Sequence, residues 1–176
     1  MVKAGETIWY TTYNSPVGII TVASSTRGVC RVSTSAEGFD QFQKWIRKQF
    51  PGCELLQGEE ENQQVIKELG EYFAGKRRDF TCKLDMQGTN FQTRVWKALG
   101  DIPYGQTCAY EDIAKAVGSD KSCRAVGQAN GANPVSIIVP CHRVIAKGGK
   151  LGGYGGGLAM KTFLLALEHR LLKFPV

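Results

Sequence analysis

The sequence predicts an α+β protein of two domains: a small β-meander with helices, then a mostly helical domain with a helix-turn-helix. Three short runs, at residues 7–14, 17–25 and 29–34, are rich in β-branched and aromatic residues and are separated by turn signals. This pattern predicts antiparallel strands. Apolar residues then recur at helical spacing over 37–50 and 61–74, which predicts two helices.

The charge balance changes near residue 88, and it places the domain boundary there. A further strand is expected at Phe80–Leu84. Residues 1–88 carry equal numbers of acidic and basic side chains. Residues 89–176 therefore hold the whole net charge of +6. Such an excess is typical of a polyanion-binding domain, although solubility alone is an alternative explanation.

The composition is that of an ordinary globular protein, with 43% hydrophobic and 22% charged residues among 176. No apolar run approaches the roughly 20 residues that span a bilayer, and the N-terminus does not resemble a signal peptide. We therefore expect a soluble protein without membrane contact that is cytoplasmic, or nuclear in a eukaryote. Six cysteines form no CxxC pair and only two histidines are present, so no metal site is expected.

The second domain begins with helical patterns. Thr89 or Asn90 is expected to cap a helix over 91–99. A helix-turn-helix follows, with a helix at 110–117, a turn at 118–121 and a second helix at 122–132 whose N-cap is Ser122.

The second helix of this pair has unusually small side chains, including Ala125 and Gly127. Gly127 and Gly131 both lie in this helix, and glycine lowers helix stability, so their presence needs a reason. Close packing inside the protein is one such reason. Close approach to a DNA minor groove is the other, and it would direct Arg124 toward the duplex.

Cys141 and His142 follow an apolar run, Val135–Val139, which is expected to be a buried strand that stops at Pro140. A thiol becomes a good nucleophile when a base removes its proton, and His142 is the adjacent base. The imidazole needs an acceptor at its other nitrogen to fix its tautomer.

Glu168 can be that acceptor. It lies in a final helix expected over 158–172, with Phe163, Leu164, Leu167 and Leu171 as the apolar stripe, and its neighbours three and four residues away are all leucine. A carboxylate among leucines is expected to be buried and paired, which suggests a Cys–His–Glu relay. An ordinary surface glutamate, or one paired with lysine or arginine, is the alternative.

Glycine-rich segments at 148–149 and 152–157 precede the final helix. Their density predicts a loop whose backbone approaches a ligand, with Tyr154 positioned to cover a flat base; a mobile linker is the alternative.

The motif Pro140-Cys141-His142-Arg143-Val144 resembles the active-site signature of the O6-alkylguanine-DNA alkyltransferases, the methylated-DNA–protein-cysteine methyltransferases. The resemblance extends over 91–168 through Phe91, Val95-Trp96, Ile102–Gly105, Tyr110, Arg124–Gly127, Asn133–Val135, Tyr154–Ala159, Lys161, Leu164-Leu165 and Glu168. It implies a ribonuclease-H-like first domain and a winged helix-turn-helix second domain.

By this resemblance, Cys141 accepts an alkyl group irreversibly from O6-alkylguanine, or from O4-alkylthymine, after the base is flipped out of double-stranded DNA. His142 would deprotonate Cys141 through a water, Glu168 would orient His142, and Asn133 would steady the network. The remaining implied residues serve DNA binding in the minor groove (Arg124, Tyr110, Ser119, Ala125, Gly127) and the base pocket (Tyr110, Val144, Tyr154, Gly155, Ser136). No cofactor is implied, because the lesion supplies the alkyl group, and the protein would act once, as a monomer.

The chain also departs from some relatives. Ser136 stands where some have proline, at the border of the alkyl pocket. The first 88 residues contain no histidine, so the zinc site of some relatives is not expected. Relatives with tryptophan in place of the cysteine only bind lesions, whereas this chain has Cys141.

Two other functions use the same residues. A cysteine hydrolase would employ the relay with turnover, but it leaves the helix-turn-helix unexplained. A DNA-binding regulator would have no use for Cys141, so Cys141→Ala would leave its activity intact.

Overall fold

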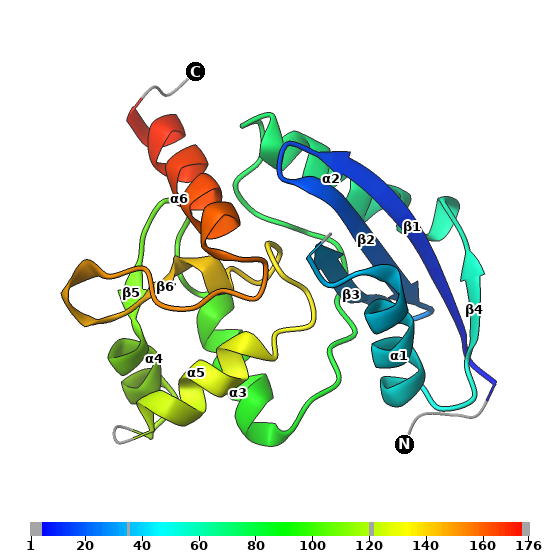
Figure 1. Cartoon of the computed structure of the whole chain (residues 1–176), viewed down its shortest axis with the longest axis horizontal. Helices are drawn as coiled ribbons and strands as arrows, with labels where there is room; N and C mark the ends of the chain where they lie inside the picture. The colour runs from blue at the N-terminus through cyan, green and yellow to red at the C-terminus, as the bar shows by residue number, and fades with distance from the viewer. Residues whose placement is uncertain (1–4, 35, 120–121, 174–176) are drawn as a thin grey trace. The chain divides into compact units, whose positions relative to one another are not determined.

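The computed structural model describes residues 5–34, 36–119 and 122–173, with the side chains of 171–173 left aside. The chain divides into two compact units, Met1–Gln87 and Gly88–Val176. Each is described by itself (Figure 1).

A four-stranded sheet forms the first unit. Its strands are β1 (Thr7–Ser15), β2 (Gly18–Ser25), β3 (Gly28–Thr34) and β4 (Glu54–Gln57), in the order β3-β2-β1-β4. β1, β2 and β3 form the predicted antiparallel meander. β4 was not predicted; it pairs parallel to β1. Its four residues are too few to show an alternating pattern, and three of them are exposed.

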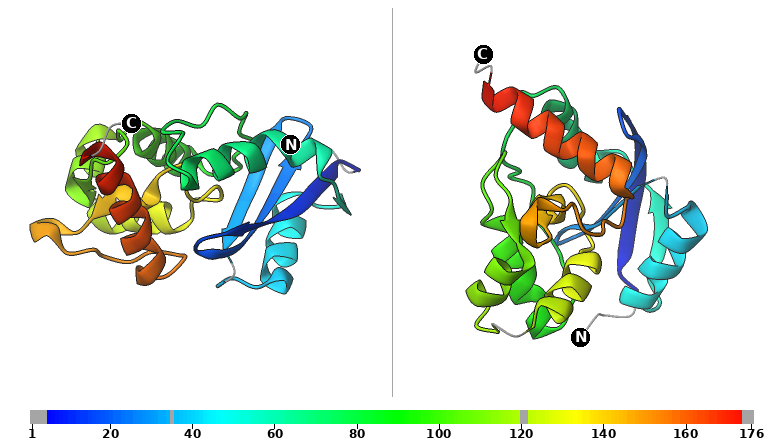
Figure 2. Two further views of the ribbon diagram at one scale, coloured as in Figure 1. Left: turned by 90° about the horizontal axis from the view of Figure 1, so that it is seen from above. Right: turned by 60° about the vertical axis from the view of Figure 1, so that its left-hand side comes forward.

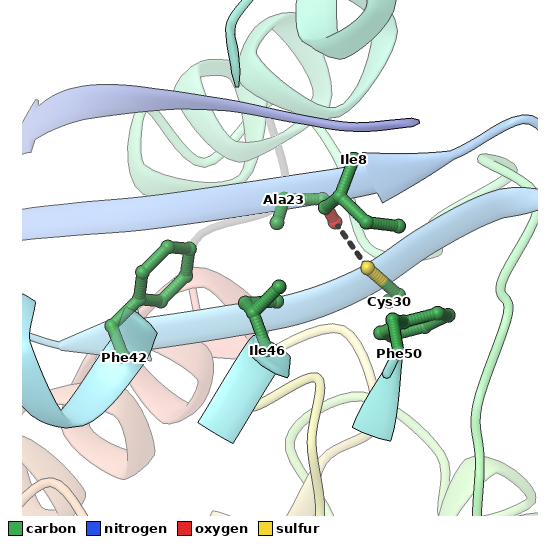
Figure 3. Close-up of a cluster of buried hydrophobic side chains, with 6 residues drawn as sticks. All are labelled: Ile8, Ala23, Cys30, Phe42, Ile46 and Phe50. Carbon is green, nitrogen blue, oxygen red and sulfur yellow. Dashed lines mark hydrogen bonds between the residues drawn. The ribbon is translucent and has the colours of Figure 1, made fainter. Parts of the chain in front are cut away.

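Two helices cover opposite faces of this sheet (Figures 1 and 2). On one face, α1 (Phe39–Gln49) packs over alternate strand residues. Figure 3 shows the resulting core, with Ile46 and the ring of Phe42 facing the strands. The full cluster is Ile8, Ala23, Cys30, Phe42, Ile46 and Phe50.

On the other face lie η1 (Glu60–Asn62) and α2 (Gln63–Phe73). Asn62 is fully buried and accepts a hydrogen bond from Ser24 at 2.9 Å, while Phe73 stacks on Tyr13. Because successive strand residues point to opposite faces, β1 and β2 supply both helices with contacts.

The predicted strand at Phe80–Leu84 is absent, which corrects that expectation. Leu84 makes only an isolated bridge with Val29. The segment is held instead by Glu68 of α2, whose carboxylate accepts from the backbone N–H of Thr81 at 2.9 Å and of Cys82 at 3.2 Å. Side-chain acceptors thus replace the partner strand that these backbone groups would otherwise need.

Helices dominate the second unit. Its elements are α3 (Asn90–Gly100), β5 (Cys108–Ala109), α4 (Tyr110–Ala116), α5 (Cys123–Gly131), η2 (Cys141–Arg143), β6 (Val144–Ile145), η3 (Lys147–Gly149) and α6 (Leu158–Lys173). α3, α4 and α5 pack against one another. Thr89 caps α3, as one of the two predicted candidates, by accepting from Gln92 N–H at 3.2 Å. Trp96 joins α3 to α5 by donating to the carbonyl of Ala129 at 2.8 Å.

The helix-turn-helix is present, and Ser122 is the N-cap residue of α5 as predicted. Ser122 precedes α5 but makes no capping bond with its side chain. Its hydroxyl accepts instead from Ser119 at 2.6 Å. Residues 120 and 121 of the predicted turn lie outside the described residues.

The predicted strand at Val135–Val139 is also absent. Val139 N–H bonds back to Val135 O at 3.0 Å, and Ile137 has φ of 75°. The segment is therefore a tight turn buried in the unit. Its β-branched composition, which suggested a strand, serves burial instead.

The apolar face of α6 is narrower than predicted. Leu164 and Leu167 are buried, whereas Phe163 is exposed; the side chain of Leu171 lies outside the described residues. Among the described helices, none has the length and hydropathy required to cross a membrane.

Candidate active site

Cys141 is the first residue of η2, directly after the turn that ends at Pro140. Its N–H donates to Val139 O at 2.8 Å, which fixes the backbone at the thiol. The side chain is only 4% exposed. Burial raises the pKa of Cys141, and hydrogen bonds from Asn133 and Ser136 lower it in part. The resting thiol is therefore protonated, and it lies beside groups that favour its anion.

His142 is fully buried and points at Glu168, with 2.7 Å between Nε2 and Oε1. Burial lowers the pKa of His142, while Glu168 opposes that shift. An ionised carboxylate can only accept, so Nε2 carries the proton and Nδ1 has a free lone pair. Nδ1 has no hydrogen-bond partner among the described residues. The ring can thus accept a proton at Nδ1.

Glu168 connects α6 to two other segments, η2 and the turn at Gly105. Besides His142, it accepts from Arg143 Nε at 2.9 Å, from Arg143 Nη2 at 3.0 Å and from Gly105 N–H at 3.0 Å. Burial alone would raise the pKa of Glu168, but the bonds from His142 and Arg143 outweigh it and lower the pKa to about 2. The carboxylate is therefore ionised at neutral pH, as the histidine's tautomer requires.

Arg143 is a site residue that the sequence reasoning left without a role. It is buried, forms a bidentate pair with Glu168, and donates from Nη1 to Ile102 O at 2.6 Å. The signal available in the sequence was an arginine within an otherwise apolar run, which suggests a buried charge that needs a partner.

Asn133 lies at the end of α5 beside Cys141. Its Nδ2 donates to Val139 O at 2.9 Å, and its Oδ1 accepts from Val135 N–H at 3.1 Å. These two bonds close the turn that precedes the cysteine. Asn133 therefore positions the Cys141 backbone in addition to its bond with the thiol.

A pocket of about 240 Å³ opens at Cys141. The predicted residues Tyr110, Gly127, Ser136, Tyr154 and Gly155 all line it. The full lining also contains Asn130, Gly131, Asn133 and Gly153. Val144, predicted as lining, is not part of it; Val144 is fully buried, and its carbonyl accepts from Lys161.

Lys161, on α6, is a second residue whose role the sequence did not reveal. It is fully buried, and its Nζ donates to Val144 O at 2.6 Å, to Leu151 O and to Gly153 O at 3.3 Å. Burial lowers the pKa of Lys161, and the charge of a Cys141 thiolate opposes that shift. Lys161 thus ties the glycine-rich loop to the segment after the cysteine.

The glycine-rich loop packs closely on the pocket. A Cβ added to Gly152 would come within 3.3 Å of the Tyr110 ring, and one added to Gly156 within 2.9 Å of Tyr154. These contacts and the tether at Lys161 favour the ligand-loop interpretation over a mobile linker.

The predicted DNA-contact residues lie on and before α5. Arg124 is exposed, Ala125 and Ser119 are partly exposed, and Gly127 faces Tyr110. A Cβ at Gly131 would meet nothing within 4 Å, so packing inside the protein does not require that glycine.

Metal-ligating side chains do not cluster anywhere in the part of the chain that the structure describes. Within residues 5–34, 36–119 and 122–173, no group of three or more His, Cys, Asp and Glu side chains could hold a metal ion.

Comparison with known proteins agrees with both units. Residues 8–86 match the family profile "6-O-methylguanine DNA methyltransferase, ribonuclease-like domain", and residues 90–170 match "6-O-methylguanine DNA methyltransferase, DNA binding domain". The inducible methylated-DNA–protein-cysteine methyltransferase of Bacillus subtilis is 46% identical over 149 residues, which cover 85% of this chain and 83% of that protein. The Mycolicibacterium paratuberculosis methyltransferase is 46% identical over 167 residues, covering 93% of each.

Solved structures give the same result. The O6-methylguanine methyltransferase of Mycobacterium tuberculosis superposes with a TM-score of 0.81 at 40% identity, covering 93% of each chain. A structure of that protein in complex with DNA gives 0.79 at 40% identity, again over 93% of each chain. The chain belongs to the methylated-DNA–protein-cysteine methyltransferase family.

Proposed function

We propose that Cys141 removes the alkyl group from O6-alkylguanine in double-stranded DNA and retains it. The observation that carries this proposal is a buried thiol that lines a pocket and is followed in the chain by a buried imidazole, His142, whose tautomer is fixed by the ionised Glu168. Membership of a family of cysteine methyltransferases supports the same reaction.

The transfer is a displacement at the alkyl carbon. His142 Nδ1 takes the thiol proton through a water molecule, and the sulfur then attacks the carbon attached to O6. The S–C bond forms as the C–O bond breaks, and the bonding pair leaves with the guanine. The hydroxyl of Tyr110, which lines the pocket, donates to the departing base. Because a thioether is stable, each molecule reacts once.

Flipping is required because the pocket lies inside the protein, and a base that is stacked and paired in the duplex cannot enter it. α5 contributes its exposed Arg124 at one end and the pocket residues Gly127 and Asn130 further along. We propose that α5 enters the minor groove and that Arg124 fills the space left by the flipped nucleotide. The DNA complex of the M. tuberculosis relative supports DNA as the partner.

Peptide mass measurement after incubation with a duplex containing O6-methylguanine tests the proposal. The Cys141 peptide should gain about 14 Da, because a methyl group replaces the thiol hydrogen. Cys123 is the internal control, because it is exposed and a non-specific alkylating agent would modify it first. No gain, or a gain on Cys123 in place of Cys141, would refute the transfer.

This mass measurement, together with DNA binding by Cys141→Ala, separates the alternatives. A cysteine hydrolase would turn over repeatedly and leave Cys141 unmodified at the end. A regulator would bind DNA equally well after Cys141→Ala and would not distinguish the lesion. Stoichiometric modification of Cys141 excludes both.

We also propose that the chain acts as a monomer in the compartment that holds the DNA. All the residues assigned to the transfer belong to the unit 88–176 of one chain, so the reaction needs no second copy. Sedimentation of the chain with a lesion-containing duplex should give one protein per lesion.

A further inference from the structure

Ser136 is the one residue with a polar side chain in the buried turn at 135–139. Val139 N–H bonds back to Val135 O at 3.0 Å, and Ser136 forms an isolated bridge with Val139, so the turn folds back on itself. Cys141 N–H donates in turn to Val139 O at 2.8 Å. Ser136 and Cys141 consequently line the same pocket, with the hydroxyl in hydrogen-bonding reach of the sulfur.

The sulfur has few side chains that can stabilise its anion. Nε2 of His142 is bonded to Glu168, and Nδ1 has no hydrogen-bond partner among the described residues, so the imidazole does not contact the sulfur directly. The side chains that bond to the sulfur are those of Asn133 and Ser136. The amide of Asn133 also holds the backbone of the turn at both of its ends. Ser136 is therefore the donor whose loss would affect the sulfur without opening the turn.

A hydroxyl suits this position because it can serve both forms of the thiol. Toward the neutral thiol it can accept from S–H, and toward the thiolate it rotates and donates its own hydrogen. A hydrogen bond to an ion is roughly twice as strong as one between neutral groups, so the hydroxyl stabilises the thiolate more than the thiol. A buried sulfur, whose anion has lost the stabilisation of water, gains most from such a donor.

We propose that Ser136 is a further catalytic residue, whose hydroxyl donates a hydrogen bond to the sulfur of Cys141 and stabilises the thiolate that attacks the lesion. This inference rests on the proposed function and adds a group to its first step. The proton of the thiol passes to His142 through a water molecule, and Ser136 keeps its own proton throughout. As the S–C bond forms, the sulfur becomes neutral and the hydrogen bond weakens.

Two variants test the hydroxyl: Ser136→Ala removes it, and Ser136→Thr keeps it. The pKa of the Cys141 thiol is measured from the rate at which iodoacetamide modifies the Cys141 peptide between about pH 7 and 11, since the thiolate is the reactive form. Ser136→Ala should raise that pKa by about one unit, because the charge-assisted bond is lost, and Ser136→Thr should leave it unchanged. Cys123 is exposed, and its modification in the same samples corrects for changes in the reagent with pH.

Single-turnover methyl transfer at neutral pH is the second measurement. A tenfold smaller thiolate population is partly offset, because a more basic thiolate is a better nucleophile with a Brønsted coefficient of about 0.5. Ser136→Ala should therefore slow transfer from O6-methylguanine in a duplex by about threefold. The same loss is expected with O6-benzylguanine in that duplex, because both reactions use the same thiolate.

An unchanged thiol pKa in Ser136→Ala, or an equal shift in Ser136→Thr, would overturn the role of the hydroxyl. A transfer loss confined to one of the two lesions would also overturn it, because the side chain would then only shape the pocket. The other ionisable groups around the sulfur are the same in all three proteins, and circular dichroism at each pH establishes that these remain folded; those groups are Tyr110, Tyr154 and Lys161.

Failure of the unsubstituted chain to modify Cys141 with either duplex would instead refute the proposed function. The iodoacetamide measurement does not depend on DNA, so it would still decide whether Ser136 stabilises the thiolate.

Discussion

At the scale of single residues, Glu168 has two roles. Its carboxylate fixes the tautomer of His142, and it also neutralises the buried guanidinium of Arg143. Chemistry and stability therefore depend on the same two oxygens. Breaking a buried pair by removing one partner is costly, because the other charge stays buried.

Glu168→Gln should slow methyl transfer by about 10²–10⁴-fold, since the neutral amide no longer stabilises the imidazolium that forms as the thiol loses its proton. It should also lower the free energy of unfolding by roughly 3 kcal/mol, because Arg143 loses its charged partner. Single-turnover transfer and denaturant unfolding measure the two effects.

Glu68→Gln is the matched control for this variant. Glu68 is equally buried, its pKa is also lowered to about 2 despite burial, and it lies in the first unit. Its replacement should reduce stability and leave the transfer rate of the folded protein unchanged. Equal transfer loss in both variants would show that Glu168 acts through stability alone.

The dependence of transfer on pH follows from His142 and Cys141. Burial lowers the pKa of His142 from its ordinary 6.5, so the ring is neutral and able to accept a proton at and above that pH. Burial raises the pKa of Cys141 from 9.0, so thiolate does not accumulate below that value. The transfer rate should be flat between these two values and should fall only below pH 6.5.

Single-turnover rates across this range, with circular dichroism at each pH, provide the measurement. An inflection within the plateau would indicate a thiolate–imidazolium pair in place of a neutral one. Stability has its own sign: the pKa of Glu168 is lowered to about 2, so its contribution is complete above its ordinary 4.5 and is lost as the pH falls toward 2.

At the scale of elements, Lys161 connects α6 to the glycine-rich loop, part of which lines the pocket. Its ammonium donates to the carbonyl of Val144, which precedes the glycine-rich loop, and to the carbonyls of Leu151 and Gly153 within that loop. The loop lacks regular secondary structure from Lys150 to Gly157, so these bonds carry much of its order.

Lys161→Met should therefore loosen the loop and slow transfer by about 10–100-fold, since a small misplacement of the pocket wall is costly to the reaction. Hydrogen exchange of residues 146–157 should become faster. Lys97→Met, at an exposed position of α3, controls for the lost charge. Unchanged exchange in the loop would contradict the tethering role.

In the first unit, Gly28 at the start of β3 lies very close to the backbone of residues 83–84. It has φ of 144°, and an added Cβ would lie 2.4 Å from the carbonyl oxygen of Lys83. Gly28→Ala should lower the free energy of unfolding by more than about 3 kcal/mol, because the backbone of residues 83–84 must move. Gly38→Ala, also at positive φ but with open space, should lower it by only about 1 kcal/mol. Similar losses measured by urea unfolding would mean that backbone strain dominates over the close approach.

At the scale of the whole molecule, the excess positive charge lies in residues 89–176. DNA binding should weaken as salt rises, because phosphate contacts release counterions. With about four such contacts, affinity should fall roughly 10²-fold between about 50 and 200 mM salt. Fluorescence anisotropy of a labelled duplex gives this slope, and a flat dependence would exclude a phosphate-binding surface.

Arg124→Ala should reduce repair in duplex DNA while sparing reaction with free O6-benzylguanine, which needs no flipping. Because Arg124 is exposed, its replacement should not disturb the fold, so a folding defect would not explain such a result. Equal loss on both substrates would show that Arg124 acts within the protein.

Periodicity in the sequence was sufficient for the meander, for α1 and for the helices around the site, because each buries one regular face. It was insufficient at 135–139, where the apolar run is buried as a turn and Ile137 has positive φ. Arg143 and Lys161 were not assigned because their partners are a distant carboxylate and backbone carbonyls, which no local pattern reveals. For Asn133, the family resemblance predicted a role at the site. Its hydrogen bonds with Val139 and Val135 could not be predicted from the sequence.

The low exposure of Cys141 also determines how long an unused molecule stays competent. A protein that one reaction inactivates must keep its thiol from oxidants and from small electrophiles in the cell, which attack exposed thiolates most readily. Cys141 is 4% exposed and its pKa is raised, so it presents little accessible sulfur and little thiolate to the solvent. The features that make the resting thiol a poor nucleophile thus preserve it for the lesion.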